Sequence, residues 1–442
     1  MDLINIKHTS ERVSFREAVL QGLGRGQGLF FPQSFETLPD VPDLLQEEFV
    51  SRSATVLGHL IGDEIDASTL QRMVTSAFDF PLEVPALDDR VHALELFHGP
   101  SLAFKDFGAR FMARCLAEFH DGGPMTILTA TSGDTGAAVA HAYYQQPGID
   151  VVILYPKGKI SPLQEKLFCT LGGNVRTIAV DSDFDTCQQL VKQSFDDPEL
   201  KQGLGLNSAN SINIARLMAQ VCYYFEAGAV VNRVEDLVLS VPSGNFGNVT
   251  AGLVARCIGL PYKRIVAATN INDTVPRFFA SGHWDPNPTI TTITNAMDIS
   301  LPNNFPRVLE LGERHGLPLA ELLTPRGHDR RGAGVEGDHS VAEHPAVGAD
   351  RGKRLSLRGD ADPPDRIART LRDGLPDHLP AGRGDLRRID FRPAALRGED
   401  GILAVSQGQQ PPLGVEDARF RSGGADVQSE VAQGRFSVMW NG

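Results

Sequence analysis

The feature that most constrains the fold is an alternation of short apolar segments with longer amphipathic ones between about residues 90 and 270. The apolar segments are rich in β-branched and aliphatic residues, and most are bounded by Gly, Pro or Asp, which predicts strands. The predicted strands are residues 126–130, 151–155, 175–180, 237–241 and 265–269. Helical periodicity is found at residues 106–119, 136–145, 184–195 and 211–226. This alternation indicates an α/β fold with mostly parallel sheets and flanking helices.

The rest of the chain divides around this core. We predict an N-terminal region of mixed helix and turn over residues 1–90 and an α/β core that binds cofactor and substrate over residues 91–324. After Thr324 the periodicity fades, and the basic residues change from sixteen Arg and eight Lys to seventeen Arg and one Lys. We interpret residues 325–442 as an atypical tail rich in Arg, Gly and Pro, either a polar segment without a packed core or a GC-rich gene translated out of frame.

Charge and cysteine content disfavour several kinds of protein. The net charge of −13 disfavours nucleic acid as a general partner. The five cysteines lie far apart without a C-x-x-C pair, so we expect reduced thiols and no metal site. No apolar run is long enough to cross a bilayer. Residues 1–10 contain no apolar segment of signal-peptide length, so we expect a cytoplasmic protein.

A lysine between phenylalanines precedes the predicted helix 106–119, in the sequence ELFHGPSLAFKDFG at residues 95–108. Packing of Phe104 and Phe107 would remove water from the Lys105 amine and favour its neutral, nucleophilic form. Asp106 is placed to cap the helix. A dehydrated lysine of this kind can bond covalently to an aldehyde. An isolated F-K-D is more often an ordinary helix start with a snorkelling lysine.

Two turns follow predicted strands and precede helices. They are TATSGDTG at residues 129–136 and VPSGNFGN at residues 241–248. Such turns present backbone N–H groups and the positive end of a helix dipole to an anion. Each also fits a strand-to-helix turn without a ligand. The spacing G-x-G-x-x-G is absent, which disfavours NAD. Together with the lysine, the two turns suit a phosphorylated aldehyde cofactor and an anionic substrate.

The same segments resemble the threonine synthase family, in its enteric-bacterial branch. The resemblance covers about residues 1–310 and includes further blocks at residues 28–32, 158–164, 205–213 and 270–278. It implies a two-lobed, pyridoxal-phosphate-dependent lyase with the fold of the tryptophan synthase β subunit. The implied reaction is a β,γ-replacement in threonine biosynthesis, in which O-phospho-L-homoserine and water give L-threonine and phosphate.

The resemblance also implies roles for residues at matched positions. Lys105 corresponds to the catalytic lysine, which bonds to pyridoxal 5'-phosphate and then moves protons. Asn248 stands where we expect an acidic residue. The implied cofactor-binding residues are Lys105, Gly244, Asn245, Phe246, Asn248 and Asp134. The implied substrate-binding residues are Ser132, Gly133, Thr135, Lys159, Asn213 and Arg216, and the last three are candidates for the substrate phosphate.

The C-terminal part departs from the family pattern. There we expect a Pro-His-small segment and a hydroxyl residue that contacts the pyridine nitrogen of the cofactor, but residues 343–347 read EHPAV. Two alternatives therefore stay open, a related amino-acid dehydratase of the same fold and a catalytically impaired homologue that binds ligands. The sequence indicates a small-molecule substrate, no nucleic acid and no membrane, and it does not indicate an oligomeric state.

Overall fold

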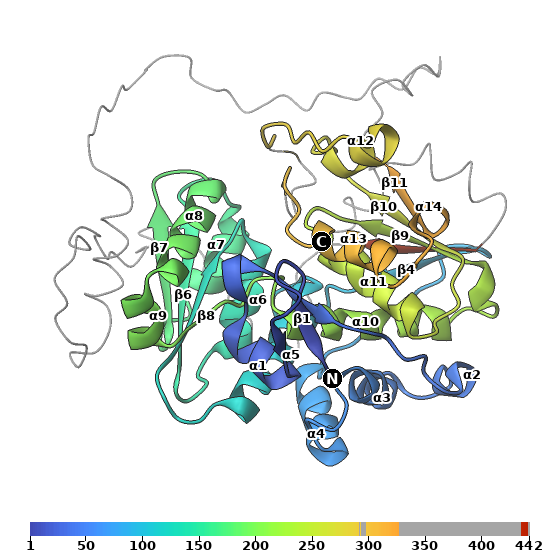
Figure 1. Ribbon diagram of the computed structural model, residues 1–442, viewed down its shortest axis with the longest axis horizontal. Coiled ribbons are helices and arrows are strands. Elements are labelled where there is room, and N and C mark those ends of the chain that lie inside the picture. The colour runs from blue at the N-terminus through green and yellow to red at the C-terminus, as the bar shows by residue number, and fades with distance from the viewer. Residues whose placement is uncertain (291, 293–297, 327–434, 441–442) are drawn as a thin grey trace, which may run out of the picture. The chain divides into compact units, whose positions relative to one another are not determined.

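The computed structural model describes residues 1–290, 292, 298–326 and 435–440, which all belong to one compact unit (Figure 1). The strands are β1 (Leu3–Asn5), β2 (Arg12–Val13), β3 (Phe30–Pro32), β4 (Val91–Glu95), β5 (Met125–Ala130), β6 (Ile149–Pro156), β7 (Val175–Val180), β8 (Leu206–Asn207), β9 (Leu237–Pro242), β10 (Arg264–Ala268), β11 (Leu323–Arg326) and β12 (Arg435–Trp440). The predicted segment 343–347 and most of the predicted tail lie outside the described residues.

Helices connect most of these strands. They are α1 (Phe15–Gln21), η1 (Arg25–Gln27), α2 (Val41–Leu44), α3 (Phe49–Ile61), α4 (Ala67–Ala77), α5 (Lys105–Phe119), α6 (Asp134–Tyr143), α7 (Pro162–Cys169), α8 (Phe184–Asp196), α9 (Pro198–Leu204), α10 (Ile214–Ala229), η2 (Val234–Asp236), α11 (Gly247–Cys257), α12 (Thr274–Ser281), α13 (Phe305–Glu313) and α14 (Leu319–Leu322). Among the described residues, no helix has the length and apolar character needed to cross a membrane.

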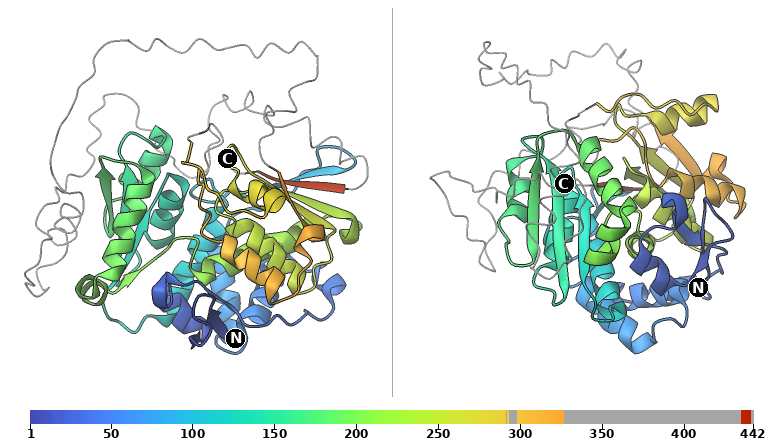
Figure 2. Two further views of the ribbon diagram at one scale, coloured as in Figure 1. Left: turned by 45° about the horizontal axis from the view of Figure 1, so that its top comes forward. Right: turned by 60° about the vertical axis from the view of Figure 1, so that its left-hand side comes forward.

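Two parallel sheets confirm the predicted α/β class. One has the strand order β7-β6-β5-β8, and its strands run side by side in Figure 2. The other has the order β11-β10-β9-β12-β4. All neighbouring strands in both sheets are parallel. Every residue of β5 is buried, as expected for a parallel strand that is covered on both faces. The predicted strand 175–180 coincides with β7, and the other four predicted strands overlap β5, β6, β9 and β10.

Helix α10 lies at the centre of the packing. Almost all of its residues are buried, and it contacts α3, α5 and α11. Helices α6 and α7 pack against each other, as do α8 and α9, and both α6 and α8 contact β5 and β6. The end of β5 and the turn after β9 both contact the middle of the segment 208–213, which leads into α10.

The structure adds a small antiparallel sheet to the helix and turn predicted for the N-terminal region. Its order is β2-β1-β3, with Leu3 opposite both Val13 and Pro32. Its strands have only two or three residues, too few for an alternating pattern to be recognised. Phe30 and Phe31 follow each other in β3, so their side chains point to opposite faces of the sheet, and both are buried.

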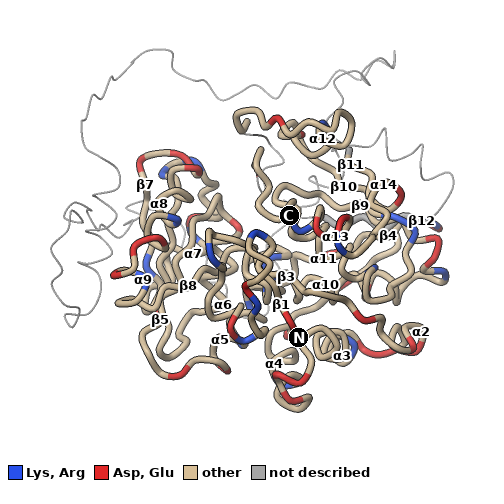
Figure 3. Tube along the Cα trace, in the orientation of Figure 1, with Lys and Arg blue, Asp and Glu red and all other residues tan. Residues whose placement is uncertain are grey.

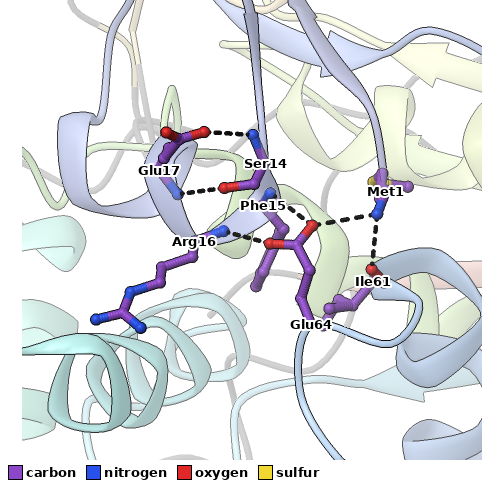
Figure 4. Close-up of polar contacts among 7 residues, drawn as sticks. All are labelled: Met1, Ser14, Phe15, Arg16, Glu17, Ile61 and Glu64. Atoms are coloured by element: carbon purple, nitrogen blue, oxygen red, sulfur yellow. Dashed lines mark hydrogen bonds and ion pairs between the residues drawn. The ribbon is translucent and has the colours of Figure 1, made fainter.

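Contacts from distant segments fix both ends of α1. At its N-terminus, the Glu64 carboxylate accepts hydrogen bonds from the backbone N–H groups of Phe15 (2.8 Å) and Arg16 (3.0 Å) and from the Met1 amine (3.1 Å), as Figure 4 shows. At its C-terminus, Nδ2 of Asn207 donates to the carbonyls of residues 19 and 20, and Nδ2 of Asn213 donates to that of residue 19. These bonds satisfy backbone groups that a helix leaves unpaired at its ends.

Replacement of Glu64 by alanine is expected to lower the free energy of unfolding by about 1–3 kcal/mol, because it removes charge-assisted acceptors from two N–H groups at the start of α1. Urea denaturation of the full chain measures the change. Asp63→Ala is the matched control, since Asp63 is adjacent and exposed, and it should change the unfolding free energy by less than about 0.5 kcal/mol. Equal effects of the two substitutions would contradict the prediction.

Candidate active site

Lys105 is the first residue of α5, and its amine is shielded from solvent. The residue is 6% exposed, and Nζ lies 5.5 Å from the centre of the Phe104 ring. Nζ donates to Oδ2 of Asp134 at 3.0 Å. The burial predicted from the flanking phenylalanines is therefore confirmed. Little water reaches an amine in this position, so water competes only weakly with the amine for an electrophile.

Asp134, the first residue of α6, is held from two sides. Its Oδ2 accepts from Lys105, and its Oδ1 accepts from Nε2 of Gln164 at 2.6 Å. Oε1 of Gln164 in turn accepts from the backbone N–H of Ser161 at 3.1 Å, in a capping box that begins α7. The start of α7 thereby fixes the orientation of the carboxylate that contacts Lys105.

Thr131 organises the turn between β5 and α6. Its Oγ1 accepts from the backbone N–H groups of Gly133 (2.9 Å) and Gly136 (2.7 Å) and donates to the Gly133 carbonyl (3.0 Å). Two of the N–H groups in this turn are therefore bonded within the protein. Thr131 thus caps Gly136 in the first turn of α6, whereas the N-cap residue Gly133 has no side chain to do so. The start of α6 remains a candidate anion site.

Asn248 closes the turn between β9 and α11. Its Oδ1 accepts from Oγ of Ser243 (2.7 Å) and from the Val249 N–H (2.9 Å), and its Nδ2 donates to the Pro242 carbonyl (2.8 Å). Phe246 has a left-handed backbone with φ of 59° and precedes α11 without a side-chain cap. An aspartate at position 248 would lack the donor to Pro242, which gives the departure from the expected acidic residue a structural role.

The segment 208–213 joins the two turns. Oδ1 of Asn210 accepts from Oγ1 of Thr129 at the end of β5. Oγ of Ser211 accepts from Nδ2 of Asn245 at 2.8 Å. The two predicted anion turns, which are more than 100 residues apart in the sequence, are therefore connected through neighbouring side chains.

A cavity of about 550 Å³ lies where these segments meet. Its wall includes Thr135 from the first turn and Asn245 from the second. The other lining residues are Ile6, Lys7, Leu23, Gln27, Leu29, Ala130, Phe184, Gln188, Val191, Lys192, Phe195, Ser208, Asn210, Ser211, Ile212, Phe278, Trp284, Ile299, Leu301, Pro302, Asn303, Phe305, Pro306 and Leu309. Lys105 and Asp134 do not line the cavity, and the Lys105 amine bonds to Asp134, which precedes Thr135 in α6.

Asp106 does not cap α5, contrary to the prediction. The residue before α5 is Phe104, without a side-chain cap, and Oδ2 of Asp106 instead accepts from the Ser101 N–H at 2.9 Å. Asp106 is fully buried. Burial raises the pKa of Asp106 to about 6, although the Ser101 hydrogen bonds and the charges of Arg110 and Arg216 act in the opposite direction.

The raised pKa of Asp106 predicts a pH-dependent stability. The folded protein favours the protonated form of Asp106, and this preference contributes to the free energy of unfolding. The contribution is fully present below the pKa of the unfolded chain, about 4, and is lost as the pH rises through about 6. We therefore compare the free energy of unfolding of the wild-type chain with that of Asp106→Asn. The wild-type value minus the variant value should be larger at about pH 4 than at about pH 8, by up to about 3 kcal/mol. Denaturant titrations of both proteins measure it, and a pH-independent difference would contradict it.

The other predicted substrate residues do not line the cavity. Asn213 is the N-cap of α10, where its Oδ1 accepts from the Ala215 N–H at 3.1 Å. Arg216 is buried and donates to the Ala209 carbonyl. Burial lowers the pKa of Arg216 to about 10, so the guanidinium stays charged at neutral pH. Lys159 is exposed in the turn after β6. Their assignment to the substrate phosphate stays a prediction.

Of the predicted site residues only Thr135 and Asn245 line the cavity, and the lining residues that sequence reasoning missed include two lysines, Lys7 and Lys192. Lys192 lies in a helix whose apolar periodicity was recognised, and its spacing from Gln188 places both on one face. Lys7 follows a three-residue strand and carries no sequence signal of its own. Acidic and basic residues are interspersed over the described chain (Figure 3), whereas the charged residues that line the cavity are these two lysines alone, as far as the described residues show.

Comparisons with known proteins reveal relatives that match both parts of the chain. A family model described as threonine synthase N terminus matches residues 4–78, and one described as pyridoxal-phosphate dependent enzyme matches residues 79–321. A threonine synthase from Haemophilus influenzae is 62% identical over 324 residues, which cover 73% of this chain and 76% of the relative. The chain belongs to the threonine synthase family.

Solved structures of threonine synthases have the same fold. The enzyme from Escherichia coli has a TM-score of 0.71 and 59% identity, and the match covers 74% of this chain and 78% of that chain. The pyridoxal-phosphate-bound threonine synthase from Brucella melitensis has a TM-score of 0.69 and 33% identity over the same shares of the two chains. The predicted fold class and the predicted pyridoxal-phosphate-dependent lyase are thereby confirmed.

The buried Lys105 amine and the start of α11 fit the cofactor of this threonine synthase family. An aldehyde requires a primary amine in a dry position, and the buried Lys105 amine meets that requirement. A phosphate requires N–H donors at a helix N-terminus, and α11 begins without a side-chain cap directly after Asn245 and Phe246. Asn245 also lines the cavity, so the start of α11 is a candidate site for a phosphate.

Proposed function

We propose that this member of the threonine synthase family converts O-phospho-L-homoserine and water to L-threonine and phosphate, and that it does so in the cytoplasm. The supporting observation is a single cavity reached by both predicted turns, through Thr135 and Asn245, with the buried Lys105 amine bonded to the residue next to Thr135. The reaction needs these three elements together, namely an amine, a grip for the cofactor phosphate and a grip for an anionic substrate.

When bound, pyridoxal phosphate supplies an electron sink that spreads negative charge away from the substrate α-carbon. In this proposal Nζ of Lys105 takes the α-proton and later returns a proton, because this buried amine is bonded to the residue next to Thr135. Asp134 accepts from Nζ and is itself held by Gln164, so it limits the directions in which the lysine can move its proton.

Two groups of residues hold the reactants in the proposal. Gly244, Asn245, Phe246 and Asn248 bind the cofactor phosphate at the start of α11. Ser132, Gly133 and Thr135 bind the substrate in the turn before and at the start of α6. The apolar part of the wall includes Phe278, Trp284 and Phe305, whose rings pack against one another.

Assay of the full chain with added pyridoxal phosphate tests the function. Phosphate and threonine are expected to form from O-phosphohomoserine in equal amounts. Formation of an oxo acid from threonine, without phosphate release from O-phosphohomoserine, would instead indicate the dehydratase. A cofactor absorbance band without either product would indicate an impaired homologue.

A further inference from the structure

The cavity is a local positive site in an acidic protein. Among the described residues, its lining contains two ammonium groups, Lys7 and Lys192, and no carboxylate, although the whole chain carries a net charge of −13. A cavity whose charged groups all have one sign concentrates small ions of the opposite sign. The two lysines are therefore suited to a small dianion.

A contact between η1 and α8 links the segments that carry the two lysines. Nζ of Lys7 donates to the Gly26 carbonyl at 3.1 Å. The next residue, Gln27, donates through Nε2 to both carboxylate oxygens of Asp196, at 3.1 and 3.3 Å. Lys192 and Asp196 are four residues apart on α8, so their side chains leave the same face of the helix.

Both ammonium groups retain hydrogen-bond donors for a ligand. Lys192 belongs to a stripe of α8 residues at helical spacing that all line the cavity, with Gln188 one turn before it. Within the described part of the chain, no residue forms an ion pair or hydrogen bond with Nζ of Lys192. Lys7 uses one of three N–H donors for Gly26.

We propose that Lys7 and Lys192 form a subsite for the phosphate monoester of the substrate, an inference that rests on the proposed function. The amino-acid end of the substrate then faces Thr135 and the Lys105 amine, and its phosphate faces η1 and α8. This subsite differs from the one predicted by resemblance, since Lys159, Asn213 and Arg216 do not line the cavity. Two cations at the phosphate end would make the pair a determinant of specificity for phosphorylated substrates.

Steady-state kinetics of Lys7→Gln, Lys192→Gln and the double variant test the proposal, with the cofactor-loaded full chain and O-phosphohomoserine. Each single substitution should raise KM about 10-fold or more, and the double variant should raise it about 100-fold, because each removes one charge-assisted hydrogen bond to phosphate. The kcat should change by less than about threefold, because neither lysine is placed at the reacting carbons. Lys192→Arg keeps the charge and should restore KM to within about threefold of wild type.

Binding of inorganic phosphate provides a second readout that does not depend on turnover. Isothermal titration calorimetry should show phosphate binding to the wild-type chain and about 100-fold weaker binding to the double variant. Lys166→Gln is the matched control, because Lys166 is exposed on α7 and has no role at the cavity. Thermal denaturation verifies that each variant is folded.

The outcomes distinguish a failure of the phosphate subsite from a failure of the proposed function. A wild-type chain that releases no phosphate from O-phosphohomoserine overturns the proposed function, and calorimetry with inorganic phosphate then decides on the subsite alone. An active wild-type chain overturns the subsite if the double variant keeps its KM and its phosphate affinity. A rise in KM for Lys159→Gln without a rise for the two cavity lysines overturns it as well.

Discussion

Replacement of Lys105 by alanine is expected to abolish threonine formation and to leave the cofactor without a covalent bond to the protein. The amine that we assign to both tasks is buried and lies 3.0 Å from Oδ2 of Asp134. Loss of a positioned acid–base group alone lowers a rate by about 10²- to 10⁴-fold, and loss of the covalent bond adds to this. Borohydride reduction followed by peptide mass spectrometry should find the cofactor on Lys105 in the wild-type chain and no modified peptide in the variant.

Lys157→Ala is the matched control for this experiment. Lys157 is exposed in the turn after β6, and its replacement should keep turnover within about twofold of wild type. A Lys105→Ala variant that retains turnover and covalent cofactor would exclude Lys105 as the catalytic lysine. A variant that binds cofactor without the covalent bond, and has no turnover, would agree with the assignment.

Replacement of Gly133 by alanine should destabilise the fold and also impair turnover. Gly133 has a φ of 137°, and a Cβ there would lie 2.3 Å from Cδ of Gln164. Backbone strain at such a φ costs about 1–3 kcal/mol. The Gln164 amide is held by Asp134 and Ser161, so its displacement also loosens the carboxylate that contacts Lys105. Urea denaturation and steady-state kinetics of the same protein measure both effects.

Gly172→Ala separates strain from displacement. Gly172 also has a positive φ, of 65°, but a Cβ there would meet nothing within 4 Å. The control should therefore cost about 1–2 kcal/mol from backbone conformation alone and should not affect turnover. If Gly133→Ala lowers the free energy of unfolding and the turnover no more than Gly172→Ala does, the contact with Gln164 affects neither stability nor turnover.

Local patterns in the sequence predicted the elements that position the site. The strand 175–180 and the helix after it were recognised because their residues alternate or repeat at the spacing of a strand or a helix. The two turns were recognised because Gly, Ser and Asn follow buried strands. Parallel strands place their carboxyl ends at one edge of a sheet, so the approach of each turn to a ligand site was also predictable.

Contacts between distant segments were not predictable from the sequence. Nothing in the sequence near Lys105 indicates that Asp134, 29 residues later, accepts a hydrogen bond from its amine. Nor does the sequence indicate that Gln164 donates to Asp134. The capping role predicted for Asp106 was wrong because the folded chain offers the Ser101 N–H as a donor to a carboxylate that α5 buries. Lys7 was missed because its place at the cavity depends on how three very short strands pair.

The amides of Asn207 and Asn213 bear on the order in which the chain can fold. They supply the hydrogen bonds for the last carbonyls of α1, yet the ribosome makes them almost two hundred residues after that helix. Until they emerge, the end of α1 has only water as a donor, and a seven-residue helix is too short to persist by itself. The earliest synthesised segment is thus expected to settle into place late in translation, once the middle of the chain is available to receive it.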